Sequence, residues 1–183
     1  MKHLFLILTI ACSLSCKNKN TTSTPTPTPA AIPPGIADVT VTSGSATTKL
    51  NGPCGWAAGV NSNFIGANDN ALIKRILSIN FNIPNLPSQT TTYKLVASSD
   101  NDGTTANIVS MSFTEISGNS NLLSWDSIST SGNVTLVVSG NKVTVNLAGI
   151  TLKAQTNSGF FTNLNVGELA KPGVLSGTLI FYK

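Results

Sequence analysis

The amino-acid sequence predicts an all-β fold, either an antiparallel β-sandwich or, as the alternative, a β-barrel. Three observations carry this prediction. Apolar and polar residues alternate with a period of two over many short runs. Turn-forming residues, mainly Gly, Asn, Asp, Ser and Pro, separate these runs at short intervals. Only residues 163–170 have the pattern of a short helix, and Pro172 and Gly173 would end it.

The chain from residue 49 to residue 83 shows how individual elements are assigned. Residues 49–56 predict a short strand, a turn at Gly52 and Pro53, and a second extended piece. The polar residues 61–70 predict a loop. Residues 72–83 predict one long strand, because apolar and polar residues alternate strictly before two prolines follow. The other predicted strands are residues 37–42, 93–97, 107–113, 123–125 and 176–183.

Residues 133–152 give the most specific prediction, a β-hairpin. Gly140-Asn141 is a two-residue turn between two alternating runs. With Ser139 opposite Lys142, the apolar residues of both runs fall on one face, and a slip by one residue would expose all of them. The alternation breaks at Ala148-Gly149, which predicts a β-bulge at Gly149. The predicted pairs are Val138 with Val143, Leu136 with Val145, and Val134 with Leu147.

Size and charge limit the class of protein. Residues 36–183 form one predicted domain of 148 residues, long enough to bury a core. This domain has eight Lys and Arg residues and seven Asp and Glu residues, a net charge of +1 within a chain total of +4. Because no basic patch remains, we exclude nucleic-acid binding.

Catalytic chemistry is restricted by the position of the one histidine, His3, which lies near the start of the chain. The domain therefore has no Ser-His-Asp triad, no Cys-His pair and no histidine metal site. We expect no enzymatic activity and no cofactor. A glycoside hydrolase with two carboxylates remains as the least favoured alternative, since it needs two acidic residues facing each other across a cleft.

Two further sites have competing interpretations. Asp100 and Asp102 lie in an Asp-Asn-Asp-Gly sequence that partly matches a calcium loop, but turn chemistry alone explains the same residues. We therefore expect no metal, with Asp100 and Asp102 as a weak calcium candidate. Cys54 is the one cysteine of the domain, so it is a small buried apolar residue, a reactive thiol or the site of an intermolecular disulfide bridge.

The aromatic residues provide the candidate ligand site. Trp56, Tyr93 and Trp125 are candidates for a flat platform that stacks against sugar rings, with core packing as the competing interpretation. Phe160 and Phe161 are adjacent, so within a strand one ring would face away from the other. They are therefore candidates for an exposed contact surface.

The N-terminal residues predict export. Residues 1–15 have a basic start, an apolar run too short to span a bilayer, and small residues before Cys16, which is the layout of a signal peptide. The cleavage region resembles the lipobox of bacterial lipoproteins, although Ser13 stands where that family usually has Leu. The resemblance implies lipidation of Cys16, with Cys12 as a weaker alternative. Residues 16–35 are rich in Thr and Pro and predict an extended linker.

The chain as a whole is similar to small Gram-negative envelope lipoproteins of uncharacterised function. The similar pieces are Leu50-Asn51-Gly52 with Trp56, Thr92-Tyr93-Lys94-Leu95, and residues 175–181. We therefore expect an outer-membrane, lipid-anchored binding or accessory module, exposed on the periplasmic face or the cell surface. Its partner besides the membrane would be a glycan or an envelope protein. The alternative is a lipocalin-like barrel that encloses a small apolar ligand.

Overall fold

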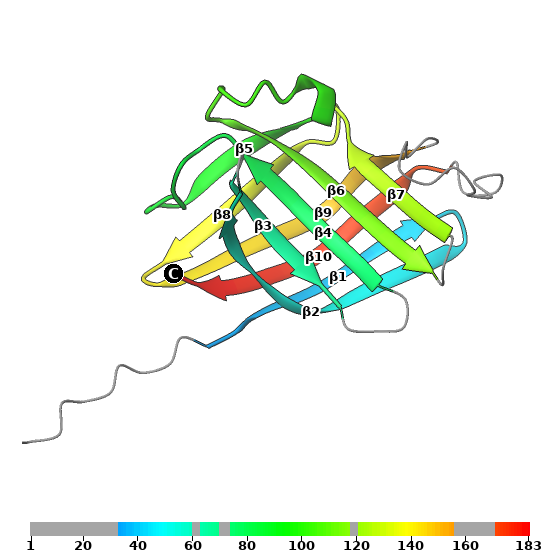
Figure 1. Cartoon of the computed structure of the whole chain (residues 1–183), viewed down its shortest axis with the longest axis horizontal. Coiled ribbons are helices and arrows are strands. Elements are labelled where there is room, and N and C mark those ends of the chain that lie inside the picture. Colours follow the sequence, from blue (N-terminus) through cyan, green and yellow to red (C-terminus); the bar gives the residue numbers. More distant parts are fainter. Residues whose placement is uncertain (1–32, 60–62, 70–73, 118–120, 156–170) are drawn as a thin grey trace, which may run out of the picture. The chain divides into compact units, whose positions relative to one another are not determined.

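The computed structural model describes residues 33–59, 63–69, 74–117, 121–155 and 171–183 (Figure 1). Within these ranges no helix is both long and apolar enough to cross a membrane. The all-β prediction is confirmed, while the helix predicted near 163–170 lies outside the described residues. The elements are β1 (Gly35–Ser43), β2 (Ala46–Ala58), β3 (Asn63–Asn68), β4 (Lys74–Phe81), β5 (Thr91–Val96), a 3-10 turn (Ser98–Asp100), β6 (Ile108–Ser117), β7 (Asn121–Ser127), β8 (Asn133–Ser139), β9 (Lys142–Ala154) and β10 (Gly173–Tyr182).

The strands form one sheet that closes on itself into a β-barrel. The first and last strands pair antiparallel, with Ile36 opposite Ile180, so the sheet formed by the described strands returns to its starting edge. The sandwich prediction is therefore wrong, and the barrel alternative is the fold that the structure has. Alternation assigns each residue to one of two faces of a strand, and both architectures satisfy it equally.

The barrel wall forks between β6 and β9. Toward the end where β2 finishes, here called the Trp56 end, β5 and β8 fill the space between these two strands. Toward the opposite end, where β4 begins, β7 alone fills it. This second end is called the Arg75 end. The ring at the Trp56 end therefore has nine strands, in the order β1-β2-β3-β4-β6-β5-β8-β9-β10.

One strand pair at the fork departs from the predicted antiparallel arrangement. β5 and β6 are parallel, with Lys94 opposite Ile108, and residues 97–107 make the return connection between them. The paired strands on the other side of the fork are antiparallel. β5 pairs only with the first residues of β6, because β7 pairs with the remaining residues of the same edge of that strand.

Two serine hydroxyls close the fork. Ser127, at the end of β7, is 1% exposed, and its Oγ donates to the Val96 carbonyl at 2.6 Å. The same Oγ accepts the Met111 amide at 2.9 Å, at the point of β6 between its pairing with β5 and its pairing with β7. Ser131 acts similarly on the β9 side, where its hydroxyl accepts the Ile128 amide and donates to the Thr151 carbonyl.

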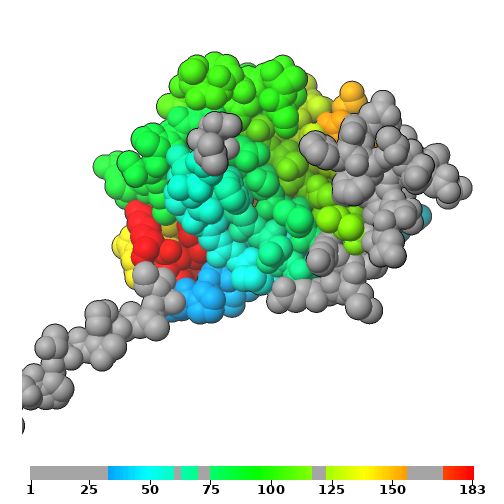
Figure 2. Space-filling model, in the orientation of Figure 1, coloured from blue at the N-terminus to red at the C-terminus, as the bar shows by residue number. Residues whose placement is uncertain are grey.

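The inner face of the barrel is filled with apolar side chains. Strand residues alternate between this interior and the outer wall, part of which β2 to β4 form in the view of Figure 2. The interior is therefore a packed core, as barrels of about this strand number commonly have. Its largest fully buried residues are Phe81, Phe113, Phe181, Leu50, Ile65, Leu77, Ile79, Leu95, Met111, Leu136, Leu152 and Leu175.

The predicted hairpin is confirmed in β8 and β9. Ser139 pairs with Lys142, and the register continues through Val138 with Val143 and Leu136 with Val145. The ladder ends at Thr135 with Asn146, one residue before the predicted pair of Val134 with Leu147. The predicted bulge is present as well. Between the pairs Leu175–Ile150 and Gly177–Leu147, β9 has one residue more than β10, and Gly149 has a φ of +64°.

Two predictions between residues 49 and 70 are wrong. β2 runs unbroken through the predicted turn at Gly52 and Pro53, and the predicted loop 61–70 contains β3. A Cβ atom on Gly52 would lie 2.1 Å from the Asn68 carbonyl oxygen, so glycine is required there by close backbone approach and not by a turn.

Candidate functional site

A pocket of about 500 Å³ lies at the Trp56 end of the barrel. Its lining residues come from the start of β1, the second half of β2, the end of β10 and the loop of residues 82–90 that follows β4. We call it the rim pocket. Its lining residues are Pro33, Gly35, Cys54, Gly55, Trp56, Asn85, Leu86, Phe181, Tyr182 and Lys183.

Gly35 determines how closely the strands approach at the rim. It is opposite Cys54 in the β1–β2 ladder. A Cβ atom on Gly35 would lie 2.1 Å from the Cys54 carbonyl oxygen and 2.7 Å from Cβ of Phe181. Any side chain would therefore push the strands apart. Gly35 contributes only backbone atoms to the pocket wall.

Among the predicted ligand residues that the structure describes, Trp56 is the one that lines the rim pocket. Its half-buried ring packs against Phe81 with 5.2 Å between ring centroids. Phe81 in turn meets Tyr93 edge to face at 5.0 Å. This aromatic stack fixes the position of the indole while part of it stays accessible. Tyr93 itself is only 3% exposed, and burial raises its pKa above the ordinary value for tyrosine.

Of the other predicted aromatic residues, Tyr93 and Trp125 do not join Trp56 on one surface. Trp125 is 3% exposed and packs against Phe113, with 6.1 Å between ring centroids. Its indole Nε1 donates to the Lys171 carbonyl at 3.3 Å. Trp125 and Tyr93 are thus core residues, as the competing interpretation stated. Phe160 and Phe161 lie outside the described residues.

Cys54 places a thiol in the wall of the rim pocket. The residue is half-buried, and its Sγ donates to the Ile180 carbonyl at 3.5 Å. Burial raises the pKa of this thiol to about 11, although the hydrogen bond to the carbonyl acts in the opposite direction. Cys54 is therefore a neutral thiol at pH 7, which gives the pocket wall a weakly polar, uncharged group.

Sequence reasoning missed the contribution of the loop 82–90. The loop supplies Asn85 and Leu86 to the pocket, and Leu86 is half-buried against the core. The available signal was a pair of prolines, Pro84 and Pro87, which marked the end of a strand without indicating where the loop would lie. Loops at one end of a barrel are a common location for binding residues.

Asp100 and Asp102 have hydrogen-bond donors from their own surroundings. Asp102 accepts the amides of Thr104 and Thr105, both at 2.8 Å, and the Thr105 hydroxyl at 2.7 Å. These hydrogen bonds, led by the Thr105 amide, lower the pKa of Asp102 well below its ordinary value. Asp100 accepts the hydroxyls of Ser99 and Ser129. Among the described residues no group of three or more His, Cys, Asp and Glu side chains could hold a metal ion.

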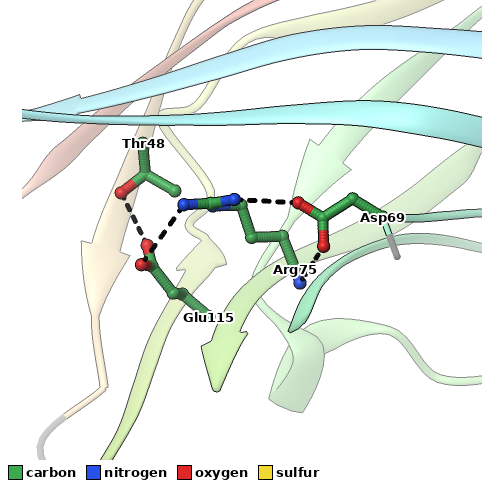
Figure 3. A network of polar contacts seen from close by, with 4 residues as sticks. All are labelled: Thr48, Asp69, Arg75 and Glu115. Atoms are coloured by element: carbon green, nitrogen blue, oxygen red, sulfur yellow. Dashed lines mark hydrogen bonds and ion pairs between the residues drawn. The ribbon is translucent and has the colours of Figure 1, made fainter. Parts of the chain in front are cut away.

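The Arg75 end contains a polar network that sequence reasoning also missed (Figure 3). Arg75 donates to Asp69 at 2.9 Å and lies 3.7 Å from Glu115, which accepts the Thr48 hydroxyl at 2.6 Å. The exposed fractions of the Arg75, Asp69 and Glu115 side chains are 19%, 6% and 10%. A signal was present, because Arg75 and Glu115 fall in phase with the buried apolar residues of their strands.

The chain was compared with known proteins. No protein-family model matches it, and no match was found among the curated proteins or the solved structures compared. The geometry of the rim pocket therefore carries the functional proposal.

Proposed function

We propose that this chain is an exported, lipid-anchored binding protein without enzymatic activity, whose barrel takes a small, partly apolar ligand in the rim pocket. The observation that carries the proposal is the pocket at the Trp56 end, with a half-buried indole in its wall. Its volume of about 500 Å³ is within the usual range of small-molecule sites, roughly 300–1,000 Å³.

The composition of the pocket supports a ligand of mixed polarity. Trp56, Leu86 and Phe181 supply apolar surface, while the Asn85 side-chain amide both donates and accepts hydrogen bonds. Because the core below is filled, the ligand would sit at the rim and not in the centre of the barrel. This differs from a barrel whose ligand occupies a central cavity.

The location of the protein in the cell envelope is a second part of the proposal. Acylation of Cys16 would anchor the chain in the outer membrane, and the Thr/Pro-rich linker 16–35 would hold the barrel away from the lipid. The test is metabolic labelling with a radioactive fatty acid. Label is expected in the wild-type chain and not in Cys16→Ala, whereas persistent labelling of Cys16→Ala would contradict the assignment.

Ligand binding is tested by tryptophan fluorescence of the chain from Lys17 onward, which keeps the linker and the whole barrel. Trp125→Phe leaves Trp56 as the only reporter, and Trp56→Phe leaves the buried Trp125 as the matched control. The variants are titrated with the apolar probe 1-anilinonaphthalene-8-sulfonate, with decanoate and with cellobiose. We expect saturable quenching or energy transfer from Trp56 and a much weaker response from Trp125.

The ligand series separates the two classes considered from the sequence. A response to decanoate and to the naphthalene probe supports an apolar ligand, and a response to cellobiose alone supports a glycan. Equal responses from the two single-tryptophan variants would place binding elsewhere. No saturable response from Trp56 with any of the three compounds would overturn the proposal.

A further inference from the structure

We infer that residues 82–90 form a lid over the rim pocket and that Leu86 controls the rate at which a ligand enters and leaves. This inference rests on the proposed ligand-binding function. It adds a gating element, which the presence of a pocket does not by itself imply. It is carried by three observations: what the loop covers, how the loop is held, and where it lacks backbone hydrogen bonds.

The loop forms one side of the pocket. Asn85 and Leu86 come from it, whereas the remaining lining residues belong to β1, β2 and β10 or directly adjoin β1 and β10. Leu86 is half-buried and packs against the same core as Trp56. A ligand in the rim pocket would therefore contact the strand ends on one side and the loop on the other.

The two ends of the loop are held by hydrogen bonds to other elements. Near its start, Nδ2 of Asn63 donates to the Ile83 carbonyl at 2.6 Å, and Nδ2 of Asn82 donates to Oδ1 of Asn101 at 2.6 Å. At its far end, the Thr90 hydroxyl accepts the Val138 amide at 3.1 Å. These bonds define two fixed points, and the residues that cover the pocket lie between them.

The middle of the loop has little backbone support. Among the described residues, positions 83–89 take part in no backbone-to-backbone hydrogen bond outside the strands. Pro84 and Pro87 have no amide hydrogen to donate. Segments with few backbone hydrogen bonds and few buried contacts open at low free energy. Two apolar side chains of the loop, Ile83 and Leu86, pack against the core, and of these two Leu86 is the one that lines the pocket.

Rapid-mixing kinetics with 1-anilinonaphthalene-8-sulfonate test the lid, again with the chain from Lys17 onward. Leu86→Ala removes the packing contact, and we expect about tenfold faster association and dissociation. A Leu86 that only contacts the ligand would leave association unchanged and alter dissociation alone. The association rate is therefore the informative measurement.

A second variant acts on the lid without changing the pocket lining. Asn63→Ala removes the hydrogen bond to the Ile83 carbonyl, and Asn63 does not line the pocket. We expect faster association of the probe. Thr92→Ala is the control, because its hydroxyl only meets that of Thr135 on the exposed surface.

The outcomes distinguish the lid from the binding function. Probe binding with unchanged association rates in both Leu86→Ala and Asn63→Ala overturns the lid and leaves the binding function intact. Binding to Leu86→Ala but not to the wild-type chain supports a lid that is closed to this probe. Absence of probe binding to every variant, together with no response of Trp56 to decanoate or cellobiose, overturns the binding function and the lid together.

Discussion

Ser127→Ala is the most direct test of how the forked barrel wall is held together. The Ser127 hydroxyl accepts the Met111 amide, and it also donates to the Val96 carbonyl. Alanine removes this oxygen but leaves the backbone of both strands in place. The substitution therefore takes one hydrogen-bond partner from a buried donor and one from a buried acceptor.

The expected magnitude follows from these two groups. Each of the two lost hydrogen bonds costs about 0.5–1.5 kcal/mol. We expect Ser127→Ala to lower the free energy of unfolding by roughly 1–3 kcal/mol, which is a large fraction of the stability of a typical domain. The Met111 amide should also exchange its hydrogen faster, because it loses the serine hydroxyl as a partner.

The assay is urea unfolding followed by the fluorescence of the buried Trp125. If the m-value, which is the slope of the free energy of unfolding against urea concentration, is the same as in the wild type, then only stability has changed. Ser124→Ala is the matched control on the same strand, since its hydroxyl is 3.4 Å from that of Thr114, and a loss below about 0.5 kcal/mol is expected. If Ser127→Ala were as stable as Ser124→Ala, the serine would not be closing the fork.

Two further predictions concern the charged network and the thiol. Arg75→Met leaves the carboxylates of Asp69 and Glu115 buried without their cation, so urea unfolding should show that the free energy of unfolding falls by about 3–5 kcal/mol. Lys49→Met is the control, because Lys49 belongs to an ion pair that is more than half exposed, and the expected loss is less than about 1 kcal/mol. Equal losses would contradict the importance of burial. For Cys54, whose pKa burial raises to about 11, the rate of alkylation by iodoacetamide should keep rising through pH 9 and 10, because only the thiolate reacts. A plateau just above pH 9.0, as expected for the denatured chain, would show that burial does not perturb the thiol.

Local patterns predicted the fold wherever a short range of residues determines the structure. Gly140-Asn141 specifies a hairpin turn, and the break in alternation at Gly149 specifies a bulge, so the register of β8 and β9 followed from the sequence. The choice between sandwich and barrel depends on contacts between distant residues, such as Ile36 with Ile180. No local pattern encodes that pairing.

Tertiary contacts also overrode one strong local signal. Gly52 and Pro53 have turn chemistry, yet β2 continues through them because Gly52 admits the backbone of Asn68. Pro53 is tolerated because β3 pairs with β2 only from Cys54 onward. At the proline, the edge of β2 that faces β3 therefore has no strand partner that needs an amide hydrogen. The roles of these residues depend on a neighbour that sequence reasoning had assigned to a loop.

The candidate site was predictable to a smaller extent. Alternation indicates which residues of a strand share a face, but not how far along the barrel each one lies. Trp56 and Trp125 both fall on inner faces, and only Trp56 is near the end where a pocket exists. The contribution of Leu86 depends on the path of a loop, which has no periodic pattern from which to derive it.

The fork makes the diameter of the barrel differ between its two ends. One strand of the wall adds about 4.8 Å to the circumference, and so roughly 1.5 Å to the diameter. Because β7 alone replaces β5 and β8, the barrel tapers like a funnel from nine strands at the Trp56 end to eight at the Arg75 end. The wider Trp56 end contains the rim pocket, while the narrower Arg75 end contains the buried ion-pair network. Substitutions in the loop 82–90 can therefore alter the pocket without removing a residue of that network.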